Sequence, residues 1–167
     1  MKNRYYLAYG SNLNIPQMEY RCPTAKVIGT AAIPNYQLLF KGSKTGSYLT
    51  IEPKEGCSVP VAVWSVKEPD ERRLDAYEGY PHFYYKKELR LPVTDIETGT
   101  VQVLNAFVYI MHEERPLGTP SKHYLQVCCE GYDYFGFDPQ YLVDAFIASS
   151  NLPTPGVTRV ERKYYEV

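Results

Sequence analysis

The chain has 167 residues, 22% of which are charged, and a formal net charge of −1. A domain of this length buries roughly 70% of the surface of its unfolded chain, so its core needs no metal ion or disulfide for stability. The near-zero net charge excludes a strong general attraction to nucleic acid or to an anionic membrane. We expect residues 1–167 to form a single domain.

Tyrosine is unusually frequent, with 17 Tyr against 6 Phe and 1 Trp. A buried tyrosine contributes a large apolar ring but keeps a hydroxyl that needs a hydrogen-bond partner. The composition therefore favours a polar cavity with aromatic walls.

The four cysteines, Cys22, Cys57, Cys128 and Cys129, form no Cys-x-x-Cys pair. This spacing predicts reduced thiols, as is usual in the cytoplasm, and argues against a zinc site or a disulfide framework. No apolar stretch approaches the ~18 residues of a membrane span, and no apolar segment of signal-peptide length follows the first residues. We therefore expect a cytoplasmic protein that binds no metal and no membrane.

The first half of the chain is dominated by strand patterns. Residues 4–9 form an apolar, aromatic run typical of a buried strand, and Ile15–Arg21 predicts a short helix with Asn14 as its N-cap. A turn is expected at Pro34-Asn35. The β-type segments that follow are residues 26–33, 36–40, 47–51 and 59–66. The last of these is apolar on both faces, which is typical of a central strand.

The second half mixes helices and strands. Residues 68–77 predict a helix with acidic residues in its first turn, ended by Gly79 and followed by Pro81. Strands are expected at residues 84–91 and Val101–Met111, helices at residues 122–132 and 139–150, and a returning edge strand at residues 157–167. These elements indicate an α+β fold, with a mainly antiparallel sheet that is curved or closed into a small barrel and a few flanking helices.

The first strand breaks at once into Tyr9-Gly10-Ser11-Asn12. Glycine adopts backbone angles that other residues avoid, and Ser and Asn side chains bond to their own backbone in turns. Such a turn can direct several N–H groups to one point, where they bind a carboxylate or an oxyanion. Short Gly-Ser-Asn segments are also common as ordinary turns, so the loop needs a partner residue to indicate a function.

Glu78 is the strongest single candidate for a catalytic group. It follows the helix predicted over residues 68–77, at an end where the helix dipole disfavours an anion, and aromatic residues flank it in sequence. Apolar surroundings raise the pKa of a carboxyl group, which suits a general base and acid near neutral pH. The alternative interpretation is an exposed glutamate at a helix end.

Other candidate nucleophiles and ligands have weaker patterns. Ser11 lacks a Gly-x-Ser-x-Gly elbow, and no histidine is paired in sequence with Ser11, Cys22 or Cys57. The histidines do not have the spacing of a metal site. Basic and aromatic residues alternate at 83–87 and 159–165, but interleaved acids favour solvated strand faces over binding of single-stranded nucleic acid.

Several motifs occur in one order along the chain: Tyr9-Gly10-Ser11-Asn12, Arg21-Cys22-Pro23, Leu74-Asp75-x-x-Glu78-Gly79 and Pro120-Ser121-x-x-Tyr124. In this order and spacing, from about residue 4 to about residue 148, the chain resembles the gamma-glutamylcyclotransferase-like (AIG2-like) family. The resemblance implies a small mixed β-barrel with flanking helices, in agreement with the elements above. It also implies a small-molecule gamma-glutamyl substrate and no cofactor, and leaves the oligomeric state open.

The family pattern implies roles for individual residues. Glu78 falls on the catalytic glutamate, and Tyr124 falls on a substrate-binding tyrosine. A further site tyrosine follows the glutamate at Tyr84 or Tyr85, and counting back from Glu88 favours Tyr84. The substrate-binding loop falls on Tyr6, Leu7, Ala8, Tyr9, Gly10 and Ser11.

The implied reaction is an intramolecular cyclisation. The α-amine of a gamma-glutamyl group attacks its own γ-carbonyl, 5-oxoproline forms and an amine leaves, while Glu78 removes and returns the proton. The turn at residues 9–11 would hold the α-carboxylate or the oxyanion. Two alternatives are the same site acting on a specialised gamma-glutamyl metabolite or isopeptide, and a non-catalytic module that binds gamma-glutamyl or acyl-amine ligands.

Overall fold

The computed structural model describes residues 3–43 and 45–150. The edge strand predicted at residues 157–167 lies outside the described residues. The strands are β1 (Arg4–Ala8), β2 (Lys26–Ser43), β3 (Gly46–Val66), β4 (Tyr84–Asp95) and β5 (Val101–Met111). The helices are the short 3-10 helix η1 (Ser11–Leu13) and the α-helices α1 (Ile15–Arg21), α2 (Glu68–Glu78), α3 (Lys122–Phe135) and α4 (Gln140–Ser149).

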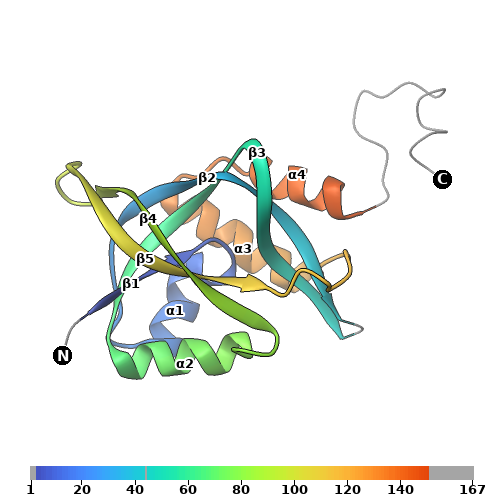
Figure 1. Ribbon diagram of the computed structural model, residues 1–167, viewed down its shortest axis with the longest axis horizontal. Helices are drawn as coiled ribbons and strands as arrows, with labels where there is room; N and C mark the ends of the chain where they lie inside the picture. Colours follow the sequence, from blue (N-terminus) through green and yellow to red (C-terminus); the bar gives the residue numbers. More distant parts are fainter. Residues whose placement is uncertain (1–2, 44, 151–167) are drawn as a thin grey trace.

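The strands close into a barrel in the order β1-β3-β2-β4-β5 (Figure 1). Strand β1 pairs antiparallel with β3 and parallel with β5, at Tyr6 and Phe107, and this parallel pair makes the barrel mixed. Strand β3 lies between β1 and β2, which confirms the central strand predicted at residues 59–66. The predicted fold class is confirmed: an α+β fold with a small, mainly antiparallel barrel and flanking helices.

Strands β2 and β3 form one long hairpin, and the prediction of separate shorter strands is wrong here. The segments on either side of Pro34-Asn35 join into β2, and those on either side of residues 52–58 join into β3. Instead of a turn there is a bulge, where the register shifts between Pro34 and Tyr36 and Asn35 takes a φ of 60°. Asparagine tolerates this conformation, and its side chain accepts a hydrogen bond from the Gly56 N–H at 3.1 Å. The turn residues therefore bend a strand around the barrel instead of ending it.

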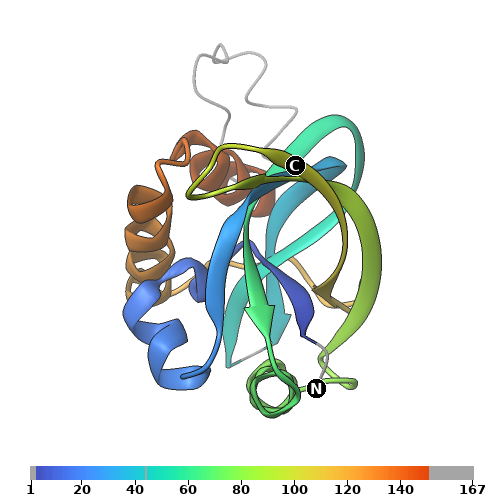
Figure 2. The ribbon, with the colours of Figure 1, turned by 90° about the vertical axis from the view of Figure 1, so that its left-hand side faces the viewer.

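The helices begin and end close to the predicted positions. Asn14 caps α1 by accepting a hydrogen bond from the Gln17 N–H at 3.2 Å, and Gly79 ends α2 with a left-handed φ of 61°. The helix predicted from residue 139 begins at Gln140, with Pro139 as its N-cap. The 3-10 helix η1 was not predicted. Figure 2 shows α1 and α3 on one side of the barrel and α2 below one of its ends.

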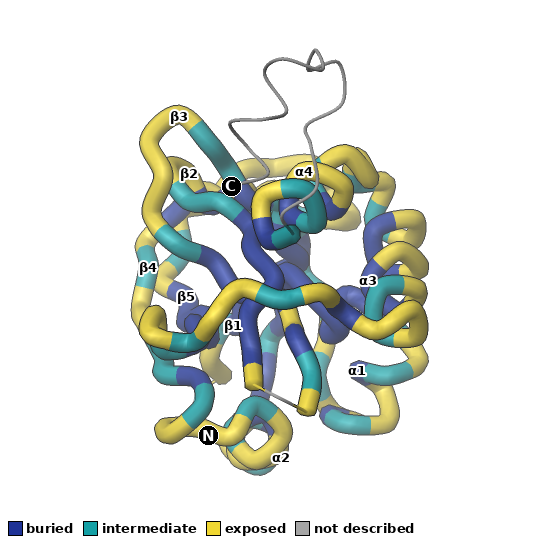
Figure 3. The backbone as a smooth tube through the Cα atoms, turned by 90° about the vertical axis from the view of Figure 1, so that its right-hand side faces the viewer, coloured by how far each residue is buried: buried dark blue, intermediate teal, exposed yellow. Residues whose placement is uncertain are grey.

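Ion pairs attach α2 to the outside of the barrel, while its other face is exposed (Figure 3). Glu71 lies 2.7 Å from both Arg4 of β1 and Lys86 of β4. Lys86 also lies 2.8 Å from Asp75, which accepts a hydrogen bond from the Tyr109 hydroxyl of β5 at 2.6 Å. Three strands thereby hold one helix, so the position of its C-terminal residue is fixed relative to the barrel.

Asn14 joins α1 to α3 in addition to capping its own helix. Its amide nitrogen donates to the Val127 carbonyl at 3.2 Å and to the Glu130 carboxylate at 2.9 Å. Nearby, Gly131 leaves room for η1, because a Cβ at residue 131 would lie 2.5 Å from the Cβ of Leu13. The chain that follows β1 is therefore held against α3 by packing and by hydrogen bonds.

We expect Asn14→Ala to lower the free energy of unfolding by about 1–2 kcal/mol, because it removes a helix cap and the bonds to α3. Chemical denaturation followed by far-UV circular dichroism measures this loss. Asn105→Ala, at an exposed position of β5, is the matched control and should change the free energy by less than about 0.5 kcal/mol. Equal losses in the two variants would contradict the joining role of Asn14.

Candidate functional site

A cavity of about 500 Å³ lies where the end of β1, the end of α2, the tip of the β2–β3 hairpin and α3 meet. Its walls agree with the polar, aromatic-lined cavity that the composition predicts. The tyrosines that line it are Tyr6, Tyr9, Tyr48, Tyr77, Tyr84, Tyr109 and Tyr124.

The structure brings most of the predicted site residues together, although they come from distant parts of the chain. Those that line the cavity are Glu78, Tyr6, Tyr9, Gly10, Ser11, Tyr84 and Tyr124. Leu7 and Ala8 do not line it, because both are completely buried in the barrel core opposite Val63 and Ala62 of β3. A strand points its side chains to alternate faces, which separates Leu7 from Tyr6. Ala8 shares a face with Tyr6 but is covered completely by its neighbours.

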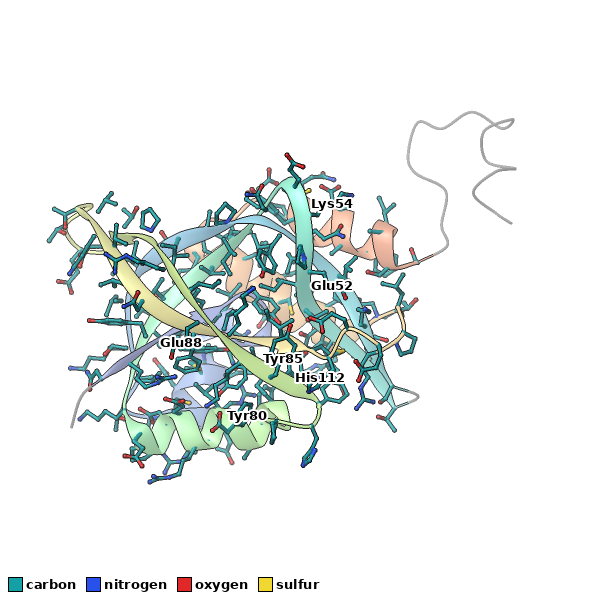
Figure 4. The ribbon with its side chains drawn as sticks, viewed as in Figure 1. Glu52, Lys54, Tyr80, Tyr85, Glu88 and His112 are labelled. Atoms are coloured by element: carbon teal, nitrogen blue, oxygen red, sulfur yellow. The ribbon has the colours of Figure 1, made fainter. Side chains whose placement is uncertain are left out.

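Tyr84 lines the cavity, whereas Tyr85 does not. The Tyr84 hydroxyl donates to the Leu49 carbonyl at 2.8 Å. The Tyr85 hydroxyl instead bonds to Glu113, and its ring centre lies 5.2 Å from that of His112, as their neighbouring positions in Figure 4 show. Successive residues of β4 point to opposite faces, which separates the two tyrosines.

Glu78 is the last residue of α2 and, among the lining residues that the structure describes, has the only charged side chain. The side chain keeps partial exposure through the cavity, and no hydrogen bond within the described residues stabilises its carboxylate. Burial raises the pKa of Glu78 from 4.5 to about 8, because the ionised carboxylate loses its hydration. The Arg21 guanidinium acts in the opposite direction and lowers the pKa of Glu78.

Neutral tyrosines surround Glu78. Burial, together with the charge of Glu78, raises the pKa values of Tyr6, Tyr9, Tyr84 and Tyr124 well above the ordinary value. Their hydroxyl groups therefore stay protonated throughout the pH range in which Glu78 titrates. Burial contributes most to each shift because the charged phenolate is disfavoured away from water.

The Tyr6 hydroxyl differs from those of Tyr9 and Tyr84 in its hydrogen bonding. The Tyr9 hydroxyl donates to the Tyr109 carbonyl at 2.7 Å. The Tyr6 hydroxyl instead accepts a hydrogen bond from the Asn12 amide nitrogen at 2.9 Å. Among the residues that the structure describes, no acceptor takes the hydrogen of Tyr6, so this hydroxyl can donate to a molecule in the cavity.

Gly10 lies close to two neighbouring side chains, and its φ of −126° is not left-handed. A Cβ at residue 10 would lie 3.2 Å from the Tyr124 hydroxyl oxygen and 3.5 Å from the Cβ of Leu49. The Tyr124 hydroxyl accepts a hydrogen bond from the Leu49 N–H at 3.0 Å. The backbone N–H groups of Tyr9 and Gly10 donate to no backbone acceptor in the described part of the chain. The loop beside the cavity therefore contains two backbone donors without a backbone acceptor.

Sequence reasoning missed several lining residues. Tyr48 and Tyr109 lie within long strands, and no local pattern distinguishes them from other strand tyrosines. Tyr77 directly precedes Glu78, and Asn12 directly follows Ser11. These neighbouring positions are the sequence signal that could have identified both residues as part of the cavity wall. Tyr77 contacts the loop directly, because its hydroxyl lies 3.0 Å from the Ser11 hydroxyl.

The other candidate nucleophiles lie in unfavourable surroundings. Burial, together with the nearby Asp70, raises the pKa of the Cys22 thiol to about 12, so little reactive thiolate forms. All four cysteines are free. Across residues 3–43 and 45–150, no cluster of His, Cys, Asp and Glu side chains is arranged to hold a metal ion. None of the helices that the structure describes has the length and apolar character needed to span a membrane.

Comparison with known proteins identifies the family. The model of the family described as gamma-glutamyl cyclotransferase, AIG2-like, matches residues 6–126. Curated proteins named gamma-glutamylcyclotransferase from Homo sapiens and Bos taurus are 27% and 28% identical to this chain over 144 residues. Each alignment covers 81% of this chain and 73% of the relative. A solved structure described as gamma-glutamyl cyclotransferase shares the fold, with a TM-score of 0.69, 24% identity and 99% of both chains covered. The chain belongs to the gamma-glutamyl cyclotransferase, AIG2-like family.

The raised pKa of Glu78 makes the stability of the fold depend on pH. Between about pH 4.5 and 8 the folded chain keeps a proton that the unfolded chain has lost, so wild-type stability falls as pH rises through this window. Glu78→Gln removes the titration, and we expect its Tm advantage over the wild type to be larger at pH 9 than at pH 5. Each 1 kcal/mol corresponds to about 3 °C for a chain of this size. Thermal denaturation at both pH values tests this, and a Tm difference independent of pH would contradict it.

Proposed function

We propose that the protein is a gamma-glutamylcyclotransferase that converts a gamma-glutamyl amino acid or amine into 5-oxoproline and a free amine, with Glu78 as general base and acid. The observation that carries this proposal is the Glu78 carboxylate, which faces a cavity of about 500 Å³ and has its pKa raised to about 8. Membership of the family supports the same class of reaction.

The basicity of Glu78 suits proton transfer from an ammonium group. A free α-amino group has a pKa of roughly 8, which is close to that of Glu78. A proton therefore passes between the two with little change in free energy. The ionised carboxylate first pairs with the substrate ammonium and then takes its proton, which leaves the α-nitrogen with the lone pair it needs to attack.

The remaining steps occur within one substrate molecule. The α-nitrogen attacks the γ-carbonyl carbon, the new C–N bond closes a five-membered lactam, and the bond to the departing amine breaks. Protonated Glu78 then gives its proton to the departing nitrogen. The ring nitrogen still carries two hydrogens, and the regenerated carboxylate takes one of them and passes it to the released amine, which leaves as an ammonium. No water is consumed and Glu78 is regenerated. Because the reaction is intramolecular, holding the folded-back conformer supplies much of the rate enhancement.

Neutral donors suit the α-carboxylate of this substrate. Across residues 3–43 and 45–150, no Lys, Arg or His side chain lines the cavity. The loop offers the N–H groups of Tyr9 and Gly10 and the hydroxyl of Ser11, and Tyr6 offers its free hydroxyl hydrogen. A cation in contact with the substrate would lower the pKa of Glu78, whereas neutral donors bind the anion and leave the base strong.

We expect Glu78→Gln to lower kcat/KM for 5-oxoproline release about 100- to 10,000-fold, because the amide cannot take up a proton. Mass spectrometry of 5-oxoproline formed from a panel of gamma-glutamyl dipeptides and amines measures turnover. In the wild type, kcat/KM should rise with pH through a midpoint near 8, since the ionised form of Glu78 is the base.

Glu97→Gln, in the exposed β4–β5 turn, is the matched control and should retain wild-type kcat/KM. Circular dichroism verifies that both variants are folded. Turnover by Glu78→Gln at the wild-type rate would remove Glu78 from the mechanism and with it the proposed chemistry.

Tyr124→Phe should raise KM about five- to tenfold and change kcat less, because it removes a hydroxyl beside Gly10 that contributes one hydrogen bond at the cavity. Steady-state kinetics on the best substrate of the panel measure both constants. Tyr134→Phe, on the exposed face of α3, is the control. Unchanged KM and kcat in Tyr124→Phe would place this hydroxyl outside the substrate contacts.

The substrate panel also separates the alternatives left by the sequence. Turnover only of a specialised gamma-glutamyl metabolite, or of gamma-glutamyl-lysine, would keep the mechanism and change the leaving amine. Binding of gamma-glutamyl compounds in calorimetry without any 5-oxoproline would instead identify a non-catalytic binding module, in which Glu78 only pairs with the ammonium.

A further inference from the structure

Arg21, the last residue of α1, contacts two walls of the cavity without lining it. Its guanidinium carbon lies 3.4 Å from the centre of the Tyr77 ring, which belongs to the end of α2. On its other side the guanidinium donates to the side-chain oxygen of Asn12, next to the loop, and to that of Gln17 at 3.4 Å. Arg21 therefore lies behind the cavity and connects its two sides.

The contact with Asn12 determines what Tyr6 presents to the cavity. Arginine has only donors, so the Asn12 atom that faces Arg21 is the amide oxygen. The amide nitrogen then faces the Tyr6 hydroxyl and donates to it at 2.9 Å. Because the Tyr6 oxygen accepts this bond, its own hydrogen is available to a molecule in the cavity. Both Asn12 and Tyr6 are buried, so water does not compete for these bonds.

The contact with Tyr77 holds the loop against the end of α2. The planar guanidinium stacks on the ring, a contact that the compact ammonium of lysine reproduces only in part. The hydroxyl of the same ring lies 3.0 Å from the Ser11 hydroxyl. Because Tyr77 directly precedes Glu78, this contact also fixes the backbone that carries the carboxylate.

The charge of Arg21 acts on Glu78. The titratable groups that face Glu78 from the surrounding elements are the neutral tyrosines Tyr6, Tyr9, Tyr84, Tyr109 and Tyr124. Arg21 is the cation, among the described residues, that acts on the pKa of Glu78, and it lowers that pKa against the effect of burial. The positive charge is set back behind Asn12 and Tyr77, so it favours ionisation of the base without forming an ion pair with it.

We propose that Arg21 is a positioning residue of this site: it orients Tyr6 through Asn12 and places its positive charge against the end of α2 that carries Glu78, and it does not touch the substrate. The inference rests on the proposed function for its kinetic consequences. Its electrostatic part can be measured in the free protein.

The test compares substitutions that separate charge from geometry. Arg21→Met removes both, Arg21→Lys keeps the charge, and Arg21→Gln is a second neutral variant that keeps an N–H donor, for use if Arg21→Met does not fold. Arg72→Met is the control, because Arg72 is exposed on α2 and pairs with Glu68. The first readout is the titration of Glu78 by carbon-13 NMR of labelled glutamate, assigned with Glu78→Gln. The second is the pH profile of kcat/KM, with KM measured separately.

We expect Arg21→Met to raise the titration midpoint of Glu78 by about one unit. At pH 7 kcat/KM should then fall about tenfold, because the ionised fraction falls tenfold for each unit. Arg21→Lys should restore the midpoint but leave KM about fivefold higher, because lysine does not reproduce the fork that orients Asn12. Arg72→Met should change neither quantity.

An unchanged titration midpoint of Glu78 in folded Arg21→Met or Arg21→Gln overturns the inference. Equal effects of Arg21→Met and Arg21→Lys on the midpoint and on KM also overturn it. Failure of the proposed function has a different signature. If the wild type releases no 5-oxoproline while the Glu78 midpoint still shifts in Arg21→Met, the cyclotransferase proposal fails and the electrostatic role of Arg21 stands.

Discussion

The pairing of β1 with both β3 and β5 closes the barrel and decides where the site forms. Because β1 is enclosed on both sides, the chain leaves the barrel at Ala8 and enters the loop at once, and η1 is packed against α3. Strand β3 leads directly into α2, which ion pairs to Arg4 and Lys86 attach to the outer surface. The loop and the end of α2 therefore meet at one opening, where Ser11 contacts Tyr77 although they are 66 positions apart.

Desolvation gives that opening its chemical character. Glu78 lies at the C-terminal end of a helix, where the helix dipole disfavours an anion, and the cavity walls remove much of the water around its carboxylate. Tyrosine hydroxyls supply polarity without charge, so they can orient a polar ligand and leave the carboxyl group basic. Arg21, which lies behind Asn12 and Tyr77, lowers the pKa of Glu78 and so partly offsets the effect of burial. The pKa of Glu78, about 8, results from the balance of these opposing influences rather than from one contact.

Some features were predictable because their causes are local. Asn14 caps its helix with its own side chain, and Gly79 takes the left-handed conformation that ends α2, so both boundaries follow from short-range chemistry. At Pro34-Asn35 the local signal was misleading, because pairing with β3 along the whole strand outweighs a turn propensity. Tyr109 could not be predicted as a cavity residue, because it differs from other strand tyrosines only in its contact with Asp75 of α2, which the tertiary structure creates.

The sequence by itself determined the class of fold, the approximate helix boundaries and the tyrosine-rich composition of a cavity, and it made Glu78 a candidate catalytic group, because each depends on neighbouring residues or on an ordered set of motifs. Only the tertiary structure decided which side chains share the cavity. It excluded Leu7 and Ala8, separated Tyr84 from Tyr85, and brought Arg21 behind the wall. Those outcomes depend on strand register and on barrel closure, which join residues far apart in the chain and leave no local signature.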